Sequence, residues 1–148
     1  MKKIIIGIDP GKGGALAIYD EYTDKYNAYN CPDTIKGMVE LTKEWSNKSS
    51  SVIAYLEKVH AFPTDGRSSA FKFGMNYGIW QGILESLDVD TVLVSPIIWQ
   101  KTFGKLPKDK QERKRRMRDI ASGISGLKAT LKTADAILIC KYGYDNER

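Results

Sequence analysis

Three carboxylates stand at places where acidic side chains could act together. Asp9 closes the β-branched run 4–8, and Glu57 closes a second apolar run, 52–56. Asp135 falls in the first turn expected for an apolar helix, where the helix dipole favours an anion. If the two runs form neighbouring parallel strands, Asp9 and Glu57 lie at the same edge of one sheet. Acidic groups gathered there repel one another and stay ionised only when cations bind between them.

The kind of cation follows from the kind of ligand. Oxygen ligands without a histidine cluster suit Mg²⁺ or Mn²⁺, and the chain contains a single histidine. Two such ions about 3.5–4 Å apart can activate a water and stabilise the leaving oxygen of a phosphodiester. Taken alone, Asp9 could equally cap its own turn. Glu57 and Asp135, each at the end of an element, favour a metal site.

The positive charge is concentrated in one segment. Nine of the 23 basic residues and two of the 18 acidic residues lie between Lys101 and Arg118, so the rest of the chain is slightly acidic. This asymmetry predicts a polyanionic partner, most often nucleic acid, with a solvated helix face as the alternative. The residues expected to contact DNA are Lys12, His60, Phe62, Arg67, Lys101, Lys105, Lys108, Lys110, Arg113 and Lys114.

The pattern of apolar runs predicts one α/β domain spanning residues 1–148. Strands are expected over 3–8, 15–19, 25–30, 52–57 and 91–94. Helices are expected over 35–45, 70–87, 97–99, 111–121 and 134–142, with caps at Thr34, at Ser68 or Ser69, and at Thr133. Ile35, Met38, Val39 and Leu41 are expected to face the core.

The location of the protein follows from what the sequence lacks. No apolar run approaches the ~18 residues of a membrane span, and no signal peptide is present. Cys31 and Cys140 have no metal-ligand spacing, and both are expected to be reduced. We therefore expect a cytoplasmic protein without membrane contact.

A row of glycines marks the long helix expected at 70–87. Gly74, Gly78 and Gly82 recur at four-residue spacing and leave one helix face almost without side chains. Each helical glycine costs up to ~1 kcal/mol, so the row requires a close packing partner, either the sheet or a second copy of the helix. The aromatic residues spread around the helix favour a homodimer, and a large core within the domain is the alternative. The expected interface residues are Gly74, Gly78, Gly82, Phe73 and Tyr77.

Four motifs in order along the chain resemble those of the RuvC-type Holliday junction resolvases, which belong to the RNase H-like superfamily. The similarity is greatest to the short phage and poxvirus-like versions, and it spans nearly the whole chain. The motifs are Gly7-Ile8-Asp9-Pro10-Gly11 with Gly14-Ala15, Leu56-Glu57-Lys58-Val59, Ser69-Ala70-Phe71-Lys72-Phe73-Gly74 with Tyr77-Gly78, and Ala134-Asp135-Ala136-Ile137-Leu138-Ile139.

The resemblance implies a fold and an activity. The fold would be RNase H-like, with a mixed five-stranded sheet of three antiparallel N-terminal strands plus parallel strands, flanked by helices. The activity would be an endonuclease in which a homodimer makes paired, symmetric nicks across a four-way DNA junction. Mg²⁺ or Mn²⁺, as two ions bound by Asp9, Glu57 and Asp135, would be the cofactor, with no nucleotide. The long helix would contribute to the dimer interface, and a phage-encoded enzyme would work in the host cytoplasm.

The chain departs from the family pattern in two places. A further aspartate usually precedes the one that matches Asp135 by three or four residues, and here Lys132 and Leu131 occupy those positions. Lys132 could neutralise a phosphate or position a water, or it could mark a weakened enzyme. An aromatic residue that wedges into the junction usually follows the glutamate by three positions, where this chain has His60. Phe62, apolar on a polar loop, is the better wedge candidate.

Three other functions compete with junction resolution. A nuclease of the same fold could cut branched or flap DNA more broadly. A protein with Lys132 in place of an acid could bind junctions without cutting them. An actin-like or hexokinase-like ATP-binding module shares the first motif, but such proteins close two domains over the nucleotide, and 148 residues leave no room for the second.

Overall fold

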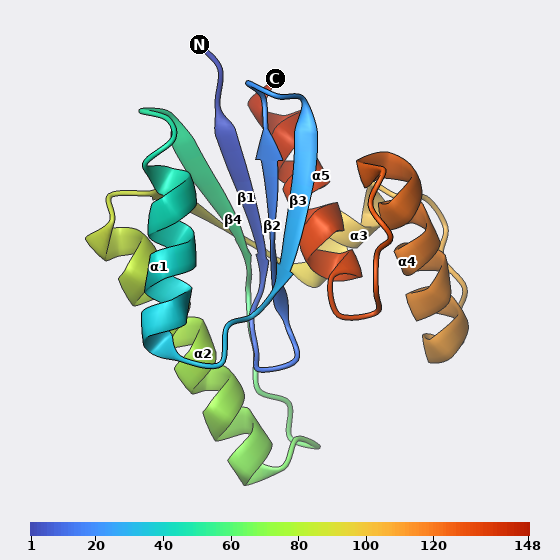
Figure 1. Cartoon of the computed structure of the whole chain (residues 1–148). Helices are drawn as coiled ribbons and strands as arrows, with labels where there is room; N and C mark the ends of the chain where they lie inside the picture. The colour runs from blue at the N-terminus through green and yellow to red at the C-terminus, as the bar shows by residue number, and fades with distance from the viewer.

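The centre of the molecule is a five-stranded sheet with strand order β3-β2-β1-β4-β5 (Figure 1). The computed structural model describes all 148 residues. β1 pairs antiparallel with β2, which pairs antiparallel with β3, while β4 lies parallel to both β1 and β5. The mixed five-stranded sheet expected from the sequence is thus confirmed. The strands are β1 (Ile4–Asp9), β2 (Ala15–Asp20), β3 (Lys25–Asn30), β4 (Val52–Glu57) and β5 (Asp90–Val94).

Helices cover both faces of the sheet, and the alternation of side chains along β1 divides the core between them. Ile4, Ile6 and Ile8 pack on the side of α1 (Ile35–Ser46) and α2 (Arg67–Ser86). Ile5 packs on the opposite side, against α5 (Ala134–Glu147), with α3 (Pro96–Lys101) and α4 (Lys110–Ser125) lying beyond it (Figure 1). Because side chains alternate in a strand, Gly7 and Asp9 share the α5 side with Ile5.

Helix α5 lies directly on the backbone of β1 at Gly7. A Cβ atom on Gly7 would stand 2.5 Å from the carbonyl oxygen of Ala136 and 2.7 Å from the Cα of Cys140. Farther along the helix, a Cβ on Gly143 would stand 2.5 Å from the ring of Tyr55. The absence of side chains at these two glycines lets the helix approach the sheet closely, and this approach fixes where the first turn of α5 lies.

Several predicted element ends need correction. Helix α2 begins at Arg67 after Gly66, which offers no side-chain cap, so the predicted cap at Ser68 or Ser69 is wrong. Thr34 does cap α1, because its hydroxyl accepts a hydrogen bond from the Gly37 amide. Thr133 occupies the N-cap position of α5, but its hydroxyl accepts from the Thr130 amide at 2.9 Å instead of from the helix.

Two helices also continue at least four residues past their predicted C-terminal ends. Helix α4 continues to Ser125, where Gly126 ends it in the left-handed conformation with φ 72°. Helix α5 continues to Glu147. In α1, Ile35 is 56% exposed rather than inward, and Met38 with Trp45 provides the buried face. Both cysteines are free, as expected, and none of the helices combines the length and the apolar character needed to cross a membrane.

The contact at Gly7 predicts a large effect from a single methyl group. Replacing Gly7 with alanine should lower the free energy of unfolding by about 1–3 kcal/mol, because the added carbon overlaps the α5 backbone. Gly123→Ala in α4 is the matched control, since a Cβ there meets open space and should stabilise the helix by about 0.5–1 kcal/mol. Urea denaturation followed by circular dichroism measures both. Equal stability of the two variants would contradict this account of the packing.

Candidate active site

The parallel pairing of β1 with β4 brings the first two carboxylates together. Ile8 stands opposite Leu56 in the register, so Asp9 and Glu57 end adjacent strands at the same edge of the sheet. Alternation along each strand directs both side chains to the α5 face. Asp135 lies in the first turn of α5, which crosses the sheet at Gly7. The structure therefore gathers the three carboxylates that the sequence singled out.

Burial and mutual repulsion raise the pKa values of the carboxylates in this cluster. Burial is the largest cause that raises the pKa of Asp9 above its ordinary value, and the charges of Asp135 and Glu57 add to the rise. Burial also raises the pKa of Glu57 to about 7 and that of Asp135 to about 6. The interaction between the two side chains raises the pKa of Asp9 further and lowers that of Glu57.

No cation of the protein neutralises the cluster by direct contact. The four ion pairs of the chain involve Glu147, Asp119 and Asp145, and none includes a carboxylate of the cluster. Lys114 is the basic residue that lowers the pKa of Asp135, opposing the effect of burial. It shares a face of α4 with Met117 and Ala121, which are buried.

Trp99 is a site residue that the sequence analysis missed. Its indole Nε1 donates a hydrogen bond of 2.8 Å to Oε2 of Glu57, and the side chain is fully buried in α3. This bond lowers the pKa of Glu57, so it favours the ionised form against the effect of burial. The run Ile97-Ile98-Trp99 predicted a short helix, but nothing in its pattern indicated which residue the indole would meet.

The arrangement and the chemistry of the carboxylate oxygens show how well this cluster suits a metal ion. No group of three or more His, Cys, Asp or Glu side chains is arranged, as the side chains stand, so that it could hold a metal ion. The chemistry of the donors nevertheless suits a hard divalent cation, because three partly buried carboxylates without ion pairs resist ionisation. A divalent cation among them would remove the repulsion. The charges of Glu57 and Asp135 both raise the pKa of Asp9, so a cation bound beside Asp9 would relieve the repulsion from both.

Most of the basic residues predicted to contact DNA lie on exposed segments. Lys12 is exposed on the β1–β2 turn, directly after the strand that carries Asp9. Arg113 is partly buried and donates to the Lys108 carbonyl at 3.2 Å, so it closes the loop before α4. Lys132 is exposed and makes no hydrogen bond or ion pair. The other basic side chains predicted to contact DNA are also exposed: Arg67, Lys101, Lys105, Lys108, Lys110 and Lys114.

The loop that follows Glu57 projects its predicted wedge into solvent. Phe62 is 64% exposed, and its amide donates to the Asp65 carboxylate at 2.8 Å, which holds the loop in a turn. His60 is also exposed. Together with Phe73 and Tyr77 they line a hollow between this loop and the first turns of α2.

The glycine face of α2 is open. A Cβ atom on Gly74, Gly78 or Gly82 would meet nothing within 4 Å, so the sheet is not the packing partner of this row. Phe73 instead touches Gly11 of the same chain, and Tyr77 packs partly against the core. Of the five predicted interface residues, only the glycines therefore remain wholly available to a partner.

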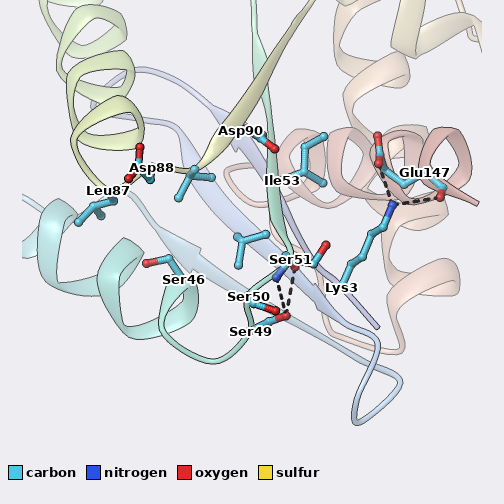
Figure 2. Close-up of a pocket in the computed structure, with 12 residues that line it drawn as sticks. Lys3, Ser46, Ser49, Ser50, Ser51, Ile53, Leu87, Asp88, Asp90 and Glu147 are labelled. Atoms are coloured by element: carbon cyan, nitrogen blue, oxygen red, sulfur yellow. Dashed lines mark hydrogen bonds and ion pairs between the residues drawn. The ribbon is translucent and has the colours of Figure 1, made fainter. Parts of the chain in front are cut away.

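A second hollow lies at the opposite end of the sheet (Figure 2). It is lined by Lys3 just before β1, by the first residues of β4 and β5, and by Glu147 at the end of α5. Lys3 pairs with Glu147 at 3.1 Å, and Ser49 accepts from the Ser51 amide, so these polar groups satisfy one another (Figure 2). None of Asp9, Glu57 and Asp135 lines this hollow, and their cluster remains the candidate site.

Comparison with known proteins identifies the fold. No protein-family model matches the sequence, and no curated protein matches it. Among solved structures, RuvC from Thermus thermophilus in complex with a Holliday junction substrate matches with a TM-score of 0.66 and 17% identity, over 98% of this chain and 96% of that one. A structure described as Thermus thermophilus RuvC matches with a TM-score of 0.62 and 19% identity, over 97% and 96%. The chain therefore has the RNase H-like fold of RuvC, in agreement with the resemblance seen in the sequence.

The raised pKa values predict an unusual dependence of stability on pH. The folded protein holds protons on Glu57 and Asp135 at pH values where the unfolded chain, with ordinary values of 4.5 and 3.8, has released them. The stabilisation that Glu57 and Asp135 contribute is therefore complete at pH values below their ordinary pKa values, and it is lost as the pH rises towards about 7. In a chelating buffer, the free energy of unfolding should fall by on the order of 2 kcal/mol between pH 5 and pH 8.

Added Mn²⁺ and a variant of Asp9 test whether the carboxylate cluster causes this pH dependence of stability. Mn²⁺ should raise the melting temperature more at pH 8 than at pH 5, because protons and the cation compete for the same oxygens. Asp9→Asn should reduce both the pH dependence and the Mn²⁺ effect, whereas Asp88→Asn, which neutralises an exposed acid at the other end of the sheet, should leave both as in the wild type. An equal Mn²⁺ effect in Asp9→Asn and wild type would contradict the assignment.

Proposed function

We propose that this protein is a metal-dependent endonuclease that resolves four-way DNA junctions by paired, symmetric nicks. The observation that carries the proposal is the cluster of Asp9, Glu57 and Asp135, which are partly buried without a compensating ion pair. The cluster lies on a fold shared with RuvC, whose solved complex contains a Holliday junction. As a DNA enzyme, the protein would act in the cytoplasm.

Asp9, Glu57 and Asp135 would hold Mg²⁺ or Mn²⁺. Bound divalent ions supply an activated water and stabilise the leaving oxygen of the phosphodiester. Trp99 supports Glu57 in this role, because its hydrogen bond fixes one carboxylate oxygen and favours the ionised form that a cation requires. Lys114, which faces Asp135, provides positive charge where a phosphate would approach. Lys132, which is exposed just before α5, would contact the same strand.

The DNA would lie over the exposed basic residues of α4 and its preceding loop. Lys12 would contact a phosphate beside the site, and Arg67, His60 and Phe62 would meet the junction from the other side of Glu57. Phe62 is our candidate for the side chain that enters the junction centre, because it is apolar and 64% exposed. Symmetric nicks require two active sites, and the open face of Gly74, Gly78 and Gly82 is our candidate for the contact between two copies.

The same geometry would also serve a broader nuclease or a protein that binds junctions without cutting. Rates of cleavage on a four-way junction, a flap and a linear duplex separate the first possibility, since equal rates would show that branching is not recognised. Tight, structure-specific binding without nicks in Mg²⁺ or Mn²⁺ would identify the second. That outcome would give Lys132, in place of a fourth acid, the role of an inactivating residue.

Replacement of Asp9 should abolish DNA cleavage without abolishing DNA binding. Asp9→Asn should lower the rate of junction cleavage by roughly 10²–10³-fold or more, because metal coordination contributes several kcal/mol to the transition state. Junction affinity, measured by gel shift in Ca²⁺, should change little. Asp88→Asn serves again as the control of equal charge change. Cleavage that persists in Asp9→Asn would refute the metal-site assignment.

Salt dependence should locate the DNA surface. Lys105, Lys108 and Lys110 are exposed and their side chains form no ion pairs. The triple alanine variant should weaken binding and lower the slope of log K against log salt by up to about 3, one unit for each lost phosphate contact. The control replaces Lys2, Lys36 and Lys43 with alanine, which removes the same number of positive charges from residues that lie away from α4. If both triple variants change the slope equally, the loop before α4 is not the DNA surface.

A further inference from the structure

The turn after Asp9 has a backbone that only glycine suits. Gly11 adopts φ 114°, and its carbonyl accepts from the Gly14 amide at 3.0 Å, which closes the turn. A Cβ on Gly14 would overlap the carbonyl oxygen of Asp9. The position of the Asp9 backbone is therefore coupled directly to the shape of residues 10–14.

Helix α2 holds this turn from the outside with two side chains on one face. The Oδ1 atom of Asn76 accepts a hydrogen bond of 2.6 Å from the Gly11 amide. The ring of Phe73, one turn earlier, packs on the same residue so closely that a Cβ on Gly11 would lie 2.6 Å from it. Gly11 is buried, so without Asn76 its amide would lose its partner within the protein.

The same asparagine reaches the next element of the fold. Its Nδ2 donates to the sulfur of Cys31 at 3.8 Å, and the Cys31 amide donates to the Gly14 carbonyl at 3.0 Å. Gly11, Gly14, Cys31 and Asn76 thus form a closed set of contacts that joins the turn, the end of β3 and α2. In Figure 1, α2 extends beyond the sheet at the end where the β1–β2 turn lies.

We propose that Asn76 is a positioning residue for Asp9: by holding the Gly11 amide it fixes the turn that directly follows Asp9, and so connects α2 to the active site. The proposal rests on the function proposed above. Asn76 touches neither the carboxylates nor the DNA in this scheme, and it acts through the backbone of residues 9–11. Asn76 lies in α2 between Gly74 and Gly78, so the open glycine face and the clamp on Gly11 belong to one rigid element.

The test compares two replacements of Asn76 that differ in one property. Asn76→Leu keeps the approximate volume and removes the acceptor, whereas Asn76→Asp keeps an acceptor for the Gly11 amide and removes the contact with Cys31. Ile83→Val is the control for a mere loss of packing, because Ile83 is buried on the same helix and lies away from the turn. Cys31→Ala removes the other partner of Asn76.

Two measurements on the full chain give independent answers. Hydrogen–deuterium exchange of residues 9–14 in the metal-free protein should quicken in Asn76→Leu and stay slow in Asn76→Asp, Ile83→Val and Cys31→Ala. In Mn²⁺, junction cleavage by Asn76→Leu should show kcat lowered roughly 10–100-fold, since displacement of a catalytic group by about 1 Å has effects of this size. Its KM should remain within about twofold of wild type, and Asn76→Asp should restore most of kcat.

The outcomes are distinct. Faster exchange together with lowered kcat, both reversed in Asn76→Asp, supports the positioning role. Wild-type kcat in Asn76→Leu overturns it, as does an equal loss of kcat in Ile83→Val. If the wild-type protein cleaves no DNA, the proposed function itself is overturned. If Asn76→Leu cleaves at the wild-type rate, only the positioning role is overturned.

Discussion

The close packing of α5 on β1 is the constraint on which the rest of this structure depends. Two glycines, Gly7 and Gly143, allow the helix backbone to touch the strand and the Tyr55 ring. Since β1 is the central strand, with β2 on one side and β4 on the other, α5 covers the middle of the sheet. This contact places Asp135 beside two carboxylates that the parallel pairing of β1 and β4 has already brought together. A bulkier residue at Gly7 would separate the third acid from the other two.

The cluster that results is unfavourable in the protein alone. Burial raises the pKa of all three acids, so the folded chain at neutral pH either keeps protons on them or holds repelling charges. Trp99 and Lys114 oppose this effect for Glu57 and Asp135, respectively, and they do so without forming an ion pair with either. Local instability of this kind is common where a site is built to receive a ligand of opposite charge.

The sequence predicted the sheet and the three acids because both depend on local patterns. Apolar runs fixed the strands of β1 and β4 to within one residue, and a carboxylate at the end of each run needed only a parallel pairing to become a neighbour. Trp99 and Asn76 could not be found in this way. Trp99 bonds to a residue 42 positions away in the sequence, and Asn76 bonds to one 65 positions away. Such contacts arise only when the elements have packed. Thr133 is the N-cap residue of α5, as predicted, but its hydroxyl accepts from the amide of the nearby Thr130 and not from the helix.

Helix α5 is held against the sheet along its whole length. At the C-terminal end, Glu147 accepts from the Tyr55 hydroxyl at 2.8 Å and pairs with Lys3. Near the start of the helix, Ala136 and Cys140 lie against the backbone of Gly7, and Ala134, Ala136 and Ile137 are buried in the core. The first turn, which carries Asp135, is therefore part of the packed interior. Because the strands and the helix are both fixed in this way, a cation would be accommodated by rotation of the carboxylate side chains and not by movement of the backbone.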